Sequence, residues 1–142
     1  MTILEAYLRV FVDPDKFDAT IAFYEQLIQG HCRMRVDYPE YHLQLADVHS
    51  PQATFLIIAG TPEARHSFEA TSLTLKVDDL QAAIRELDEL GAEHLEPVQS
   101  TPSGIKTRYR HPDGLIVEYV EYQEEKLKKR RVSPDKSSET LA

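Results

Sequence analysis

Apolar and polar residues alternate over the first twelve positions, which is the pattern of a strand with one buried face. The apolar side chains fall on even positions from Leu4 to Val12. The opposite face carries two charged and two aromatic residues: Glu5, Tyr7, Arg9 and Phe11. An antiparallel strand with one solvated face would show the same alternation. Two aromatic side chains on the second face nevertheless favour the wall of a half-buried pocket.

A helix and three further strands follow in the sequence. Apolar residues recur at helical spacing from Phe17 to Ile28, and Gly30 suits the end of a helix. Three shorter extended runs lie between residues 33 and 58, separated by turns that contain proline. The predicted order of elements over residues 3–60 is therefore βαβββ.

The same order repeats in the second half of the chain. A strand over residues 72–77 leads into a helix whose apolar stripe runs from Leu80 to Leu90 and ends before Gly91. Three more extended runs complete the unit by residue 122. Repeated units of this size also occur inside pseudo-symmetric single domains. The sequence predicts an α+β fold of two tandem βαβββ modules, at about 3–60 and 71–122.

Charge divides the chain into an acidic body and a basic end. Residues 1–122 hold ten Lys or Arg and twenty Asp or Glu, whereas residues 123–142 hold six and four. An acidic body argues against a nucleic-acid partner, because phosphate contacts need clustered cations. The last segment is rich in charge, Ser and Pro and lacks aromatic residues. We therefore expect a domain over 1–122 and a disordered tail from 123 that adds nothing to the fold.

Length and apolar content indicate the protein's environment. The chain has 142 residues, about one domain, and its longest apolar run is far shorter than the roughly 20 residues of a membrane helix. The N-terminus has no basic segment before an apolar one, so no signal peptide is predicted. A single cysteine, Cys32, excludes an internal disulfide and CxxC motifs. We expect a soluble, cytoplasmic protein without a membrane partner.

Short motifs in both modules carry a family resemblance. They are Leu8-Arg9-Val10, Ala22-Phe23-Tyr24, Leu75-Lys76-Val77-Asp78-Asp79-Leu80, Leu90-Gly91-Ala92 and His111-Pro112-Asp113-Gly114-Leu115-Ile116-Val117-Glu118. With them the chain resembles the vicinal oxygen chelate superfamily, which includes glyoxalase I, bleomycin-resistance proteins and extradiol dioxygenases. The resemblance implies that the modules curl a mixed sheet into a cup with the ligand inside. It also implies a homodimer, because module edges in the family often pair across a two-fold axis.

The resemblance also implies where a metal site would lie. Family ligands come from the first and last strand of each module, and those positions fall on Glu5, Leu56, Ser72 and Glu118. A transition-metal site needs three or four imidazole or carboxylate ligands. Two carboxylates, an aliphatic side chain and a hydroxyl do not supply them, so we expect no metal and no other cofactor.

These expectations favour a protein that binds a small, partly aromatic molecule without metal, similar to the antibiotic-binding members of the superfamily. The expected ligand-binding residues are Glu5, Tyr7, Arg9, Phe11, His42, Gln44, Leu56, Ser72 and Glu118. Among them Tyr7, Phe11 and Leu56 would give apolar contact, whereas the polar residues would orient the ligand.

Other interpretations stay open. Glu118 fits a carboxylate paired with Arg9 or Arg108 as well as a ligand anchor. An enzyme with a degenerate divalent-metal site at Glu5, Glu118 and His42 is one alternative function, as a lyase, isomerase or dioxygenase. A regulatory protein that dimerises through its sheet is another. No residue separates sequestration of a ligand from its catalytic conversion.

Overall fold

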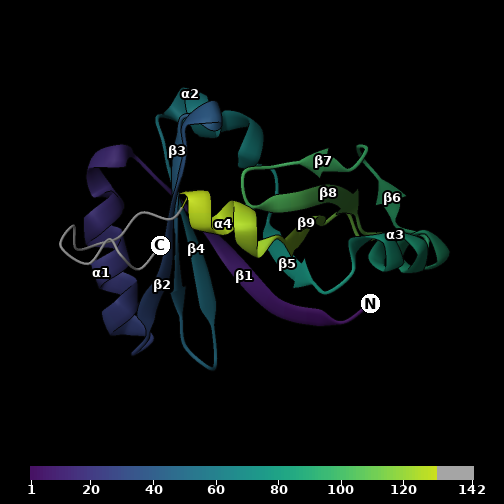
Figure 1. Cartoon of the computed structure of the whole chain (residues 1–142), viewed down its shortest axis with the longest axis horizontal. Coiled ribbons are helices and arrows are strands. Elements are labelled where there is room, and N and C mark those ends of the chain that lie inside the picture. The colour runs from purple at the N-terminus through teal and green to yellow at the C-terminus, as the bar shows by residue number, and fades with distance from the viewer. Residues whose placement is uncertain (131–142) are drawn as a thin grey trace.

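The structure is a computed structural model, and it describes residues 1–130. The two modules follow each other along one curved sheet (Figure 1). The first module consists of β1 (Ile3–Val12), α1 (Phe17–Leu27), β2 (His31–Tyr38), β3 (Leu43–His49) and β4 (Thr54–Ala59). The second consists of β5 (Leu73–Val77), α3 (Leu80–Glu89), β6 (Glu93–His94), β7 (Gln99–Ser100), β8 (Gly104–Arg110) and β9 (Ile116–Tyr122). The predicted α+β fold of two modules is confirmed, and β7 is an additional short strand.

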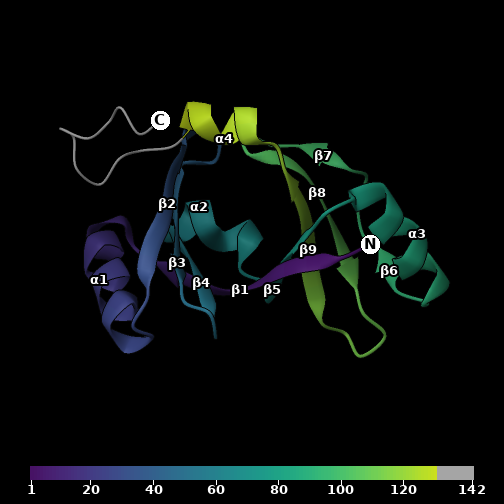
Figure 2. The ribbon, with the colours of Figure 1, turned by 60° about the horizontal axis from the view of Figure 1, so that its bottom comes forward.

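The strands of residues 1–130 form one mixed sheet in the order β2-β3-β4-β1-β5-β9-β8-β6, and β7 pairs with β8. β1 runs parallel to β4 and antiparallel to β5, so the modules join through these central strands within a single chain. Figure 2 shows the result, a cup whose two walls rise on either side of β1 and β5. The sequence alone did not tell whether the modules pair within or between chains.

Each wall of the cup is covered on its outer face by a helix. Ile21 of α1 packs in one buried cluster with Val48 and Ile57, and Leu80 of α3 does so with Val117. Burying one such side chain contributes about 1.5–3 kcal/mol. Because side chains alternate along a strand, the neighbours of these residues point into the cup. The helices therefore fix which face of each strand is available to a ligand.

Local signals set the ends of α3. The side chain of Asp79 accepts a hydrogen bond from the Ala82 backbone N–H at 3.1 Å, which satisfies a donor that the first turn leaves free. Gly91 follows the helix with a φ of +86°, a left-handed conformation that glycine adopts without strain. Both residues occupy the positions that the sequence predicts.

The connection between the modules contains a short helix, α2 (Pro62–Arg65), and a 3-10 turn (His66–Phe68). Thr61 caps α2 by accepting a hydrogen bond from the Ala64 backbone N–H at 3.2 Å. Phe68, at the end of this connection, packs against the buried cluster inside the cup. A segment between the modules therefore contributes to the cup interior.

The expected tail differs from the structure over its first residues, because α4 (Glu124–Arg130) is helical. Leu127 is only 4% exposed and packs in the cluster inside the cup. The Lys126 ammonium donates hydrogen bonds to Ser100 Oγ at 2.7 Å and to the Gly104 carbonyl at 3.2 Å. Figure 2 shows α4 lying across the opening between β2 and β8. Residues 131–142 of the expected tail lie outside the described part.

No helix within residues 1–130 is both long and apolar enough to cross a membrane.

Candidate functional site: a charged apolar cup

A cavity that is partly open to solvent lies between the two walls of the cup. Its aliphatic wall consists of Leu43, Leu45, Leu56, Ile58 and Val120. Its aromatic wall consists of Tyr38, Tyr41, Phe68 and Tyr122. Polar atoms are contributed by Arg9, Thr101, Ser103, Lys106 and Glu118. A largely apolar lining with a few polar groups is typical of small-molecule sites.

Glu118 is the buried carboxylate of this cavity. The Lys106 ammonium lies 3.4 Å from its Oε2, and the Thr74 hydroxyl donates a hydrogen bond to its Oε1 at 3.0 Å. Burial alone would raise the pKa of Glu118, but the charges of Arg9 and Lys106 outweigh it and hold the pKa below its ordinary value. Glu118 is therefore ionised at neutral pH.

Arg9 is the second charged group of the cavity. Among residues 1–130 its guanidinium has no hydrogen-bonded or ion-paired partner, and its Nε is fully buried. The guanidinium carbon lies 5.5 Å from the centre of the Phe11 ring. Burial lowers the pKa of Arg9, and the charge of Glu118 partly opposes that shift. An arginine pKa is so high that Arg9 stays protonated, so the cavity holds an unpaired cation.

A second, more polar cavity adjoins the first and shares Arg9, Lys106 and Glu118 with it. Arg108 lies in its wall and donates two hydrogen bonds to Glu96 Oε1, from Nε at 3.1 Å and from Nη2 at 3.0 Å. Arg108 is thus neutralised by Glu96 and does not pair with Glu118. Of the two arginines expected beside Glu118, Arg108 pairs with Glu96, whereas Arg9 acts on Glu118 through its charge and Lys106 makes the ion pair.

Three of the residues predicted from the sequence meet in the cavity: Arg9, Leu56 and Glu118. Tyr7 and Phe11 lie close by without lining it. Tyr7 is 1% exposed in the buried cluster beside the cavity, and Phe11 packs against that cluster. These two support the cavity wall instead of offering a ligand surface.

Glu5 belongs to a separate ion cluster on the same side of the sheet. Its Oε2 accepts a hydrogen bond from Arg33 at 2.8 Å and one from the Thr54 hydroxyl at 2.5 Å, and it lies 2.9 Å from His49 Nδ1. Burial opposes the ionisation of Glu5, but the hydrogen bonds from Thr54 and Arg33 hold its pKa below the ordinary value. Glu5 does not line the two cavities that contain Glu118.

Asp47 is the other carboxylate of this ion cluster and is only 3% exposed. Arg33 donates to its Oδ2 at 2.7 Å, whereas its Oδ1 is buried without a hydrogen bond from residues 1–130. Burial raises the pKa of Asp47 and outweighs the opposing effect of Arg33. The cluster is held together by one arginine between two carboxylates.

The structure places three other predicted residues away from the cavity. Gln44 is exposed on the face of β3 that also carries Ala46, which packs in the α1 cluster. His42 precedes β3 in a left-handed conformation and is exposed. Ser72 precedes β5 and is exposed as well. The structure does not bring His42, Gln44 and Ser72 to the two cavities that contain Glu118. For Gln44 the reason is that the odd positions of β3 face inwards.

Sequence reasoning missed Lys106 and most of the aromatic wall. Lys106 stands two residues before Arg108 on β8, so the two share the inward face, and this could be read from the sequence. The ion pair of Lys106 with Glu118 depends on the register between β8 and β9, which the sequence does not show. Tyr122 shares the face of Glu118 along β9, which was a usable signal. Tyr41 and Phe68 belong to turns, for which the pattern gives no facing direction.

Comparisons with known proteins decide the family. A profile of the Glyoxalase/Bleomycin resistance protein/Dioxygenase superfamily matches residues 8–119. The chain belongs to this superfamily. A comparison with curated protein sequences gives no significant match.

Solved structures of the superfamily fold include a hypothetical protein from Methanosarcina mazei, with 34% identity over 87% of this chain and 95% of that one and a TM-score of 0.73. Methylmalonyl-CoA epimerase from Mycobacterium tuberculosis is similar over 85% of this chain and 89% of its own, with 18% identity and a TM-score of 0.63. A 4-hydroxymandelate synthase variant from Streptomyces coelicolor is covered over 48% of its length by 82% of this chain, with 16% identity and a TM-score of 0.54. The last two likenesses show the fold alone.

Strand register relates the expected metal positions of the two modules. Leu56 pairs with Arg9, and Glu118 pairs with Thr74. With Leu56 and Glu118 as counterparts, Tyr7 corresponds to Ser72, because each stands two residues before the paired residue of its first strand. The match of Leu8-Arg9-Val10 with Leu75-Lys76-Val77 makes Glu5 the counterpart of Ser72 instead.

The residues at these positions do not fit a metal centre. Leu56 has no ligand atom, the Tyr7 hydroxyl donates to Glu5 at 3.2 Å, and burial raises the Tyr7 pKa far above neutrality. The remaining carboxylate, Glu118, already faces Lys106. No group of three or more His, Cys, Asp and Glu side chains within residues 1–130 is arranged to hold a metal ion.

Proposed function

We propose that the protein binds a small organic molecule in the cup and that no metal ion takes part. The observation that carries this proposal is the placement of two organic cations, Arg9 and Lys106, around Glu118. Glu118 occupies the superfamily's metal-ligand position in the second module. A divalent cation there would be repelled by both side chains and would find too few ligand atoms.

The remaining walls support a ligand of mixed character. Leu56 is 4% exposed and Ile58 1% exposed, and both line the cavity beside aromatic rings. A ligand with an apolar body would make its apolar contacts with these walls. The polar groups would then fix the ligand's orientation.

The metal-dependent alternative needs Glu5, Glu118 and His42 to converge. Glu5 is occupied by Arg33 and Thr54, and His42 is exposed outside the cavity. These contacts favour the metal-independent function over a lyase, isomerase or dioxygenase with a degenerate site. Whether a bound molecule is only held or is also converted stays outside the proposal.

We also propose that two copies associate through the outer face of β1. No helix of residues 1–130 covers Leu4 and Leu8, which are 54% and 48% exposed. A second copy would bury this strip, as expected for a member of a superfamily that often forms dimers. Sedimentation at micromolar concentration should give a dimer for the wild type and a monomer for Leu8→Glu. A wild-type monomer would contradict the association. The cytoplasmic location stays a prediction.

Two measurements test the proposed function. First, protein incubated with Zn²⁺, Ni²⁺, Mn²⁺ or Fe²⁺ and then dialysed should retain well below one metal per chain by elemental analysis. Second, a fragment screen in chelating buffer should shift the methyl resonances of Leu56 and Ile58. Leu56→Glu, which buries a carboxylate in the apolar wall, should abolish the response at Ile58, whereas Leu90→Glu at a 74% exposed position should not. If the wild type retains about one metal ion per chain and Glu118→Gln retains none, the proposal is refuted.

A further inference from the structure

We propose that the ligand of the cup is an organic anion, a carboxylate on an apolar body, and that Arg9 and Lys106 bind its charged group. This inference rests on the proposed function and narrows it to one chemical class. It starts from Arg9, the one cavity cation of residues 1–130 that has no hydrogen-bonded or ion-paired partner.

A buried guanidinium without a partner lowers the stability of the protein unless a ligand supplies the missing hydrogen bonds and charge. Buried polar groups are nearly always hydrogen-bonded, and a buried charge without a partner is destabilising. Arg9 has its Nε fully buried and lines both adjoining cavities. Its planar fork of N–H donors matches the two oxygens of a carboxylate. The missing partner is therefore an anion that residues 1–130 do not supply, and we infer that a ligand provides it.

Lys106 is placed to share that anion. Its ammonium lies 3.4 Å from Glu118, 5.5 Å from the Phe68 ring centre and 5.9 Å from the Tyr41 ring centre. One ion pair uses only part of the three donors of an ammonium group. Lys106 and Arg9 therefore both face Glu118 from the cavity wall, and both retain donors for a second carboxylate.

The charge balance of the two cavities also favours an anion. Their walls hold three cations, Arg9, Lys106 and Arg108, against two carboxylates, Glu96 and Glu118. One positive charge is in excess there, although the chain as a whole carries a net charge of −8. A positive cavity in an acidic protein concentrates field at the cavity and excludes cationic ligands.

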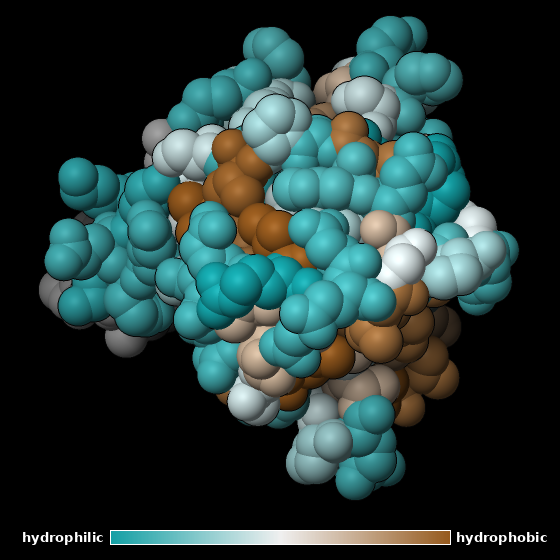
Figure 3. Space-filling view, turned by 90° about the vertical axis from the view of Figure 1, so that its right-hand side faces the viewer, coloured by the Kyte–Doolittle hydropathy of each residue, from teal (hydrophilic) through white to brown (hydrophobic). Residues whose placement is uncertain are grey.

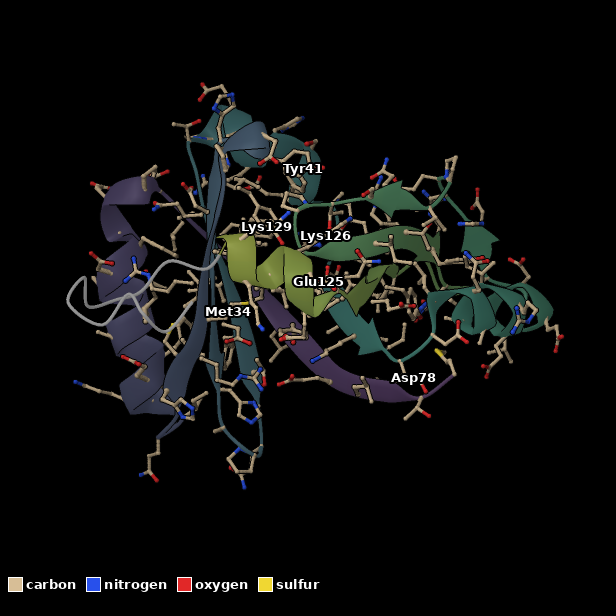
Figure 4. The ribbon with its side chains drawn as sticks, in the orientation of Figure 1. Met34, Tyr41, Asp78, Glu125, Lys126 and Lys129 are labelled. Atoms are coloured by element: carbon tan, nitrogen blue, oxygen red, sulfur yellow. The ribbon has the colours of Figure 1, made fainter. Side chains whose placement is uncertain are left out.

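The opening of the cup carries further positive charge. A surface cleft beside α4 holds two lysines, Lys126 and Lys129, against one carboxylate, Glu40, and shares Tyr41 and Thr101 with the apolar cavity. In Figure 4 the labelled Lys126 and Lys129 lie on the Tyr41 side of α4, whereas Glu125 lies on the other side. An approaching anion would pass these lysines before it reaches Arg9. The association rate should therefore fall as salt is added.

Three probes with one aromatic body separate charge from shape: 2-naphthoate, 2-naphthamide and 2-naphthylmethylammonium. Calorimetric or NMR titration of the full chain in chelating buffer should give at least tenfold tighter binding of the carboxylate than of the amide. The ammonium probe should bind weakest of the three. All three have similar apolar surface, so the differences report the charged group.

Variants identify the residues responsible. Arg9→Gln and Lys106→Met should each reduce the preference for 2-naphthoate over 2-naphthamide to about threefold or less, with little change in binding of the amide. Lys128→Gln removes the same charge from an exposed position of α4 and should keep the preference. Arg9→Gln removes a buried guanidinium without a hydrogen-bonded partner, but it also removes a charge that stabilises the Glu118 carboxylate, so we expect only a small change in melting temperature. A purely structural Arg9 would instead show a large fall in melting temperature with an unchanged preference for 2-naphthoate.

The possible results separate the preference for an anion from small-molecule binding itself. Equal binding of all three probes, or a carboxylate preference that survives both variants, would overturn the anion inference and leave small-molecule binding intact. Failure of every probe to shift the methyl resonances of Leu56 and Ile58 would count against both.

Discussion

Leu127 tests whether α4 packs over the cup. Charge and composition alone predict that this residue lies in a disordered tail, whereas the structure buries it inside the cup. Leu127→Ala removes a side chain that is 4% exposed and packs in the cluster with Met34 and Tyr7. Leu→Ala changes at buried positions cost about 2–5 kcal/mol. The helix α4 has seven residues and cannot hold itself together without packing. Detachment of the helix limits the loss, so we expect about 2 kcal/mol.

Urea unfolding followed by circular dichroism measures this free energy, since the chain has seven tyrosines and no tryptophan for fluorescence. In a thermal scan the same loss corresponds to a fall of about 4–8 °C at this chain length. The matched control is Lys128→Ala, an exposed change on the same helix, which should stay within about 0.5 kcal/mol of the wild type. If Leu127→Ala is as stable as this control, α4 does not pack against the sheet, and its position across the opening of the cup is wrong.

Three further changes test other parts of the structure. Glu118→Gln should destabilise the protein by roughly 3 kcal/mol at pH 7, because the two cations Arg9 and Lys106 lose the carboxylate they face. The folded pKa of Glu118 lies below the ordinary 4.5, so the loss of stability should be full above pH 4.5 and shrink as the pH falls through the folded pKa. A pH-independent difference in urea titrations would contradict the ionised state of Glu118. Cys32, whose pKa burial raises to about 11, should react with an aromatic disulfide reagent at pH 8 at least tenfold more slowly than free cysteine. Gly30→Ala should lower the free energy of unfolding more than Gly91→Ala, because a Cβ on Gly30 would lie 2.3 Å from the His49 carbonyl oxygen. Equal losses of about 1 kcal/mol for the two variants would show that β3 moves to make room for the methyl group at position 30.

The alternation along β1 was enough to predict the inner face of the cup at its centre. Arg9 follows from that pattern, and Leu56 and Glu118 follow from the family resemblance; all three meet in one cavity. Here the side-chain period of two and the turn signals agree, so local pattern and tertiary structure give the same answer.

The face of β3 could not be predicted in the same way. Both of its faces carry apolar residues, because Ala46 packs under α1 while Leu43 and Leu45 line the cavity. Period alone assigns residues to two faces but does not say which face a helix covers. Gln44 was therefore assigned to the wrong side.

Lys106 and Leu127 were missed for a different reason. Alternation along β8 indicates the face of Lys106 but not its ion pair with Glu118, and Leu127 stands alone among charged neighbours without a periodic signal. Their roles depend on register between β8 and β9 and on docking of α4 across the opening. Contacts between residues distant in the chain are not contained in a local pattern.

Figure 3 shows the end of the molecule that carries α3, where polar side chains predominate and apolar ones gather on part of the face. Exposed apolar residues of the described part include Leu90 and Leu115, and single exposed apolar residues are normal on a protein surface. Within residues 1–130 the cup combines charged groups and apolar walls in one cavity, so we expect the ligand there.

Native mass spectrometry of the protein purified without added ligand tests the central claim most directly, because one spectrum reports metal and organic adducts on the same ion. We predict a noncovalent organic adduct. The adduct should be released as an anion and be lost in Leu56→Glu, and no bound metal should be seen. One metal ion per chain, present without any organic adduct and absent in Glu118→Gln, would contradict it.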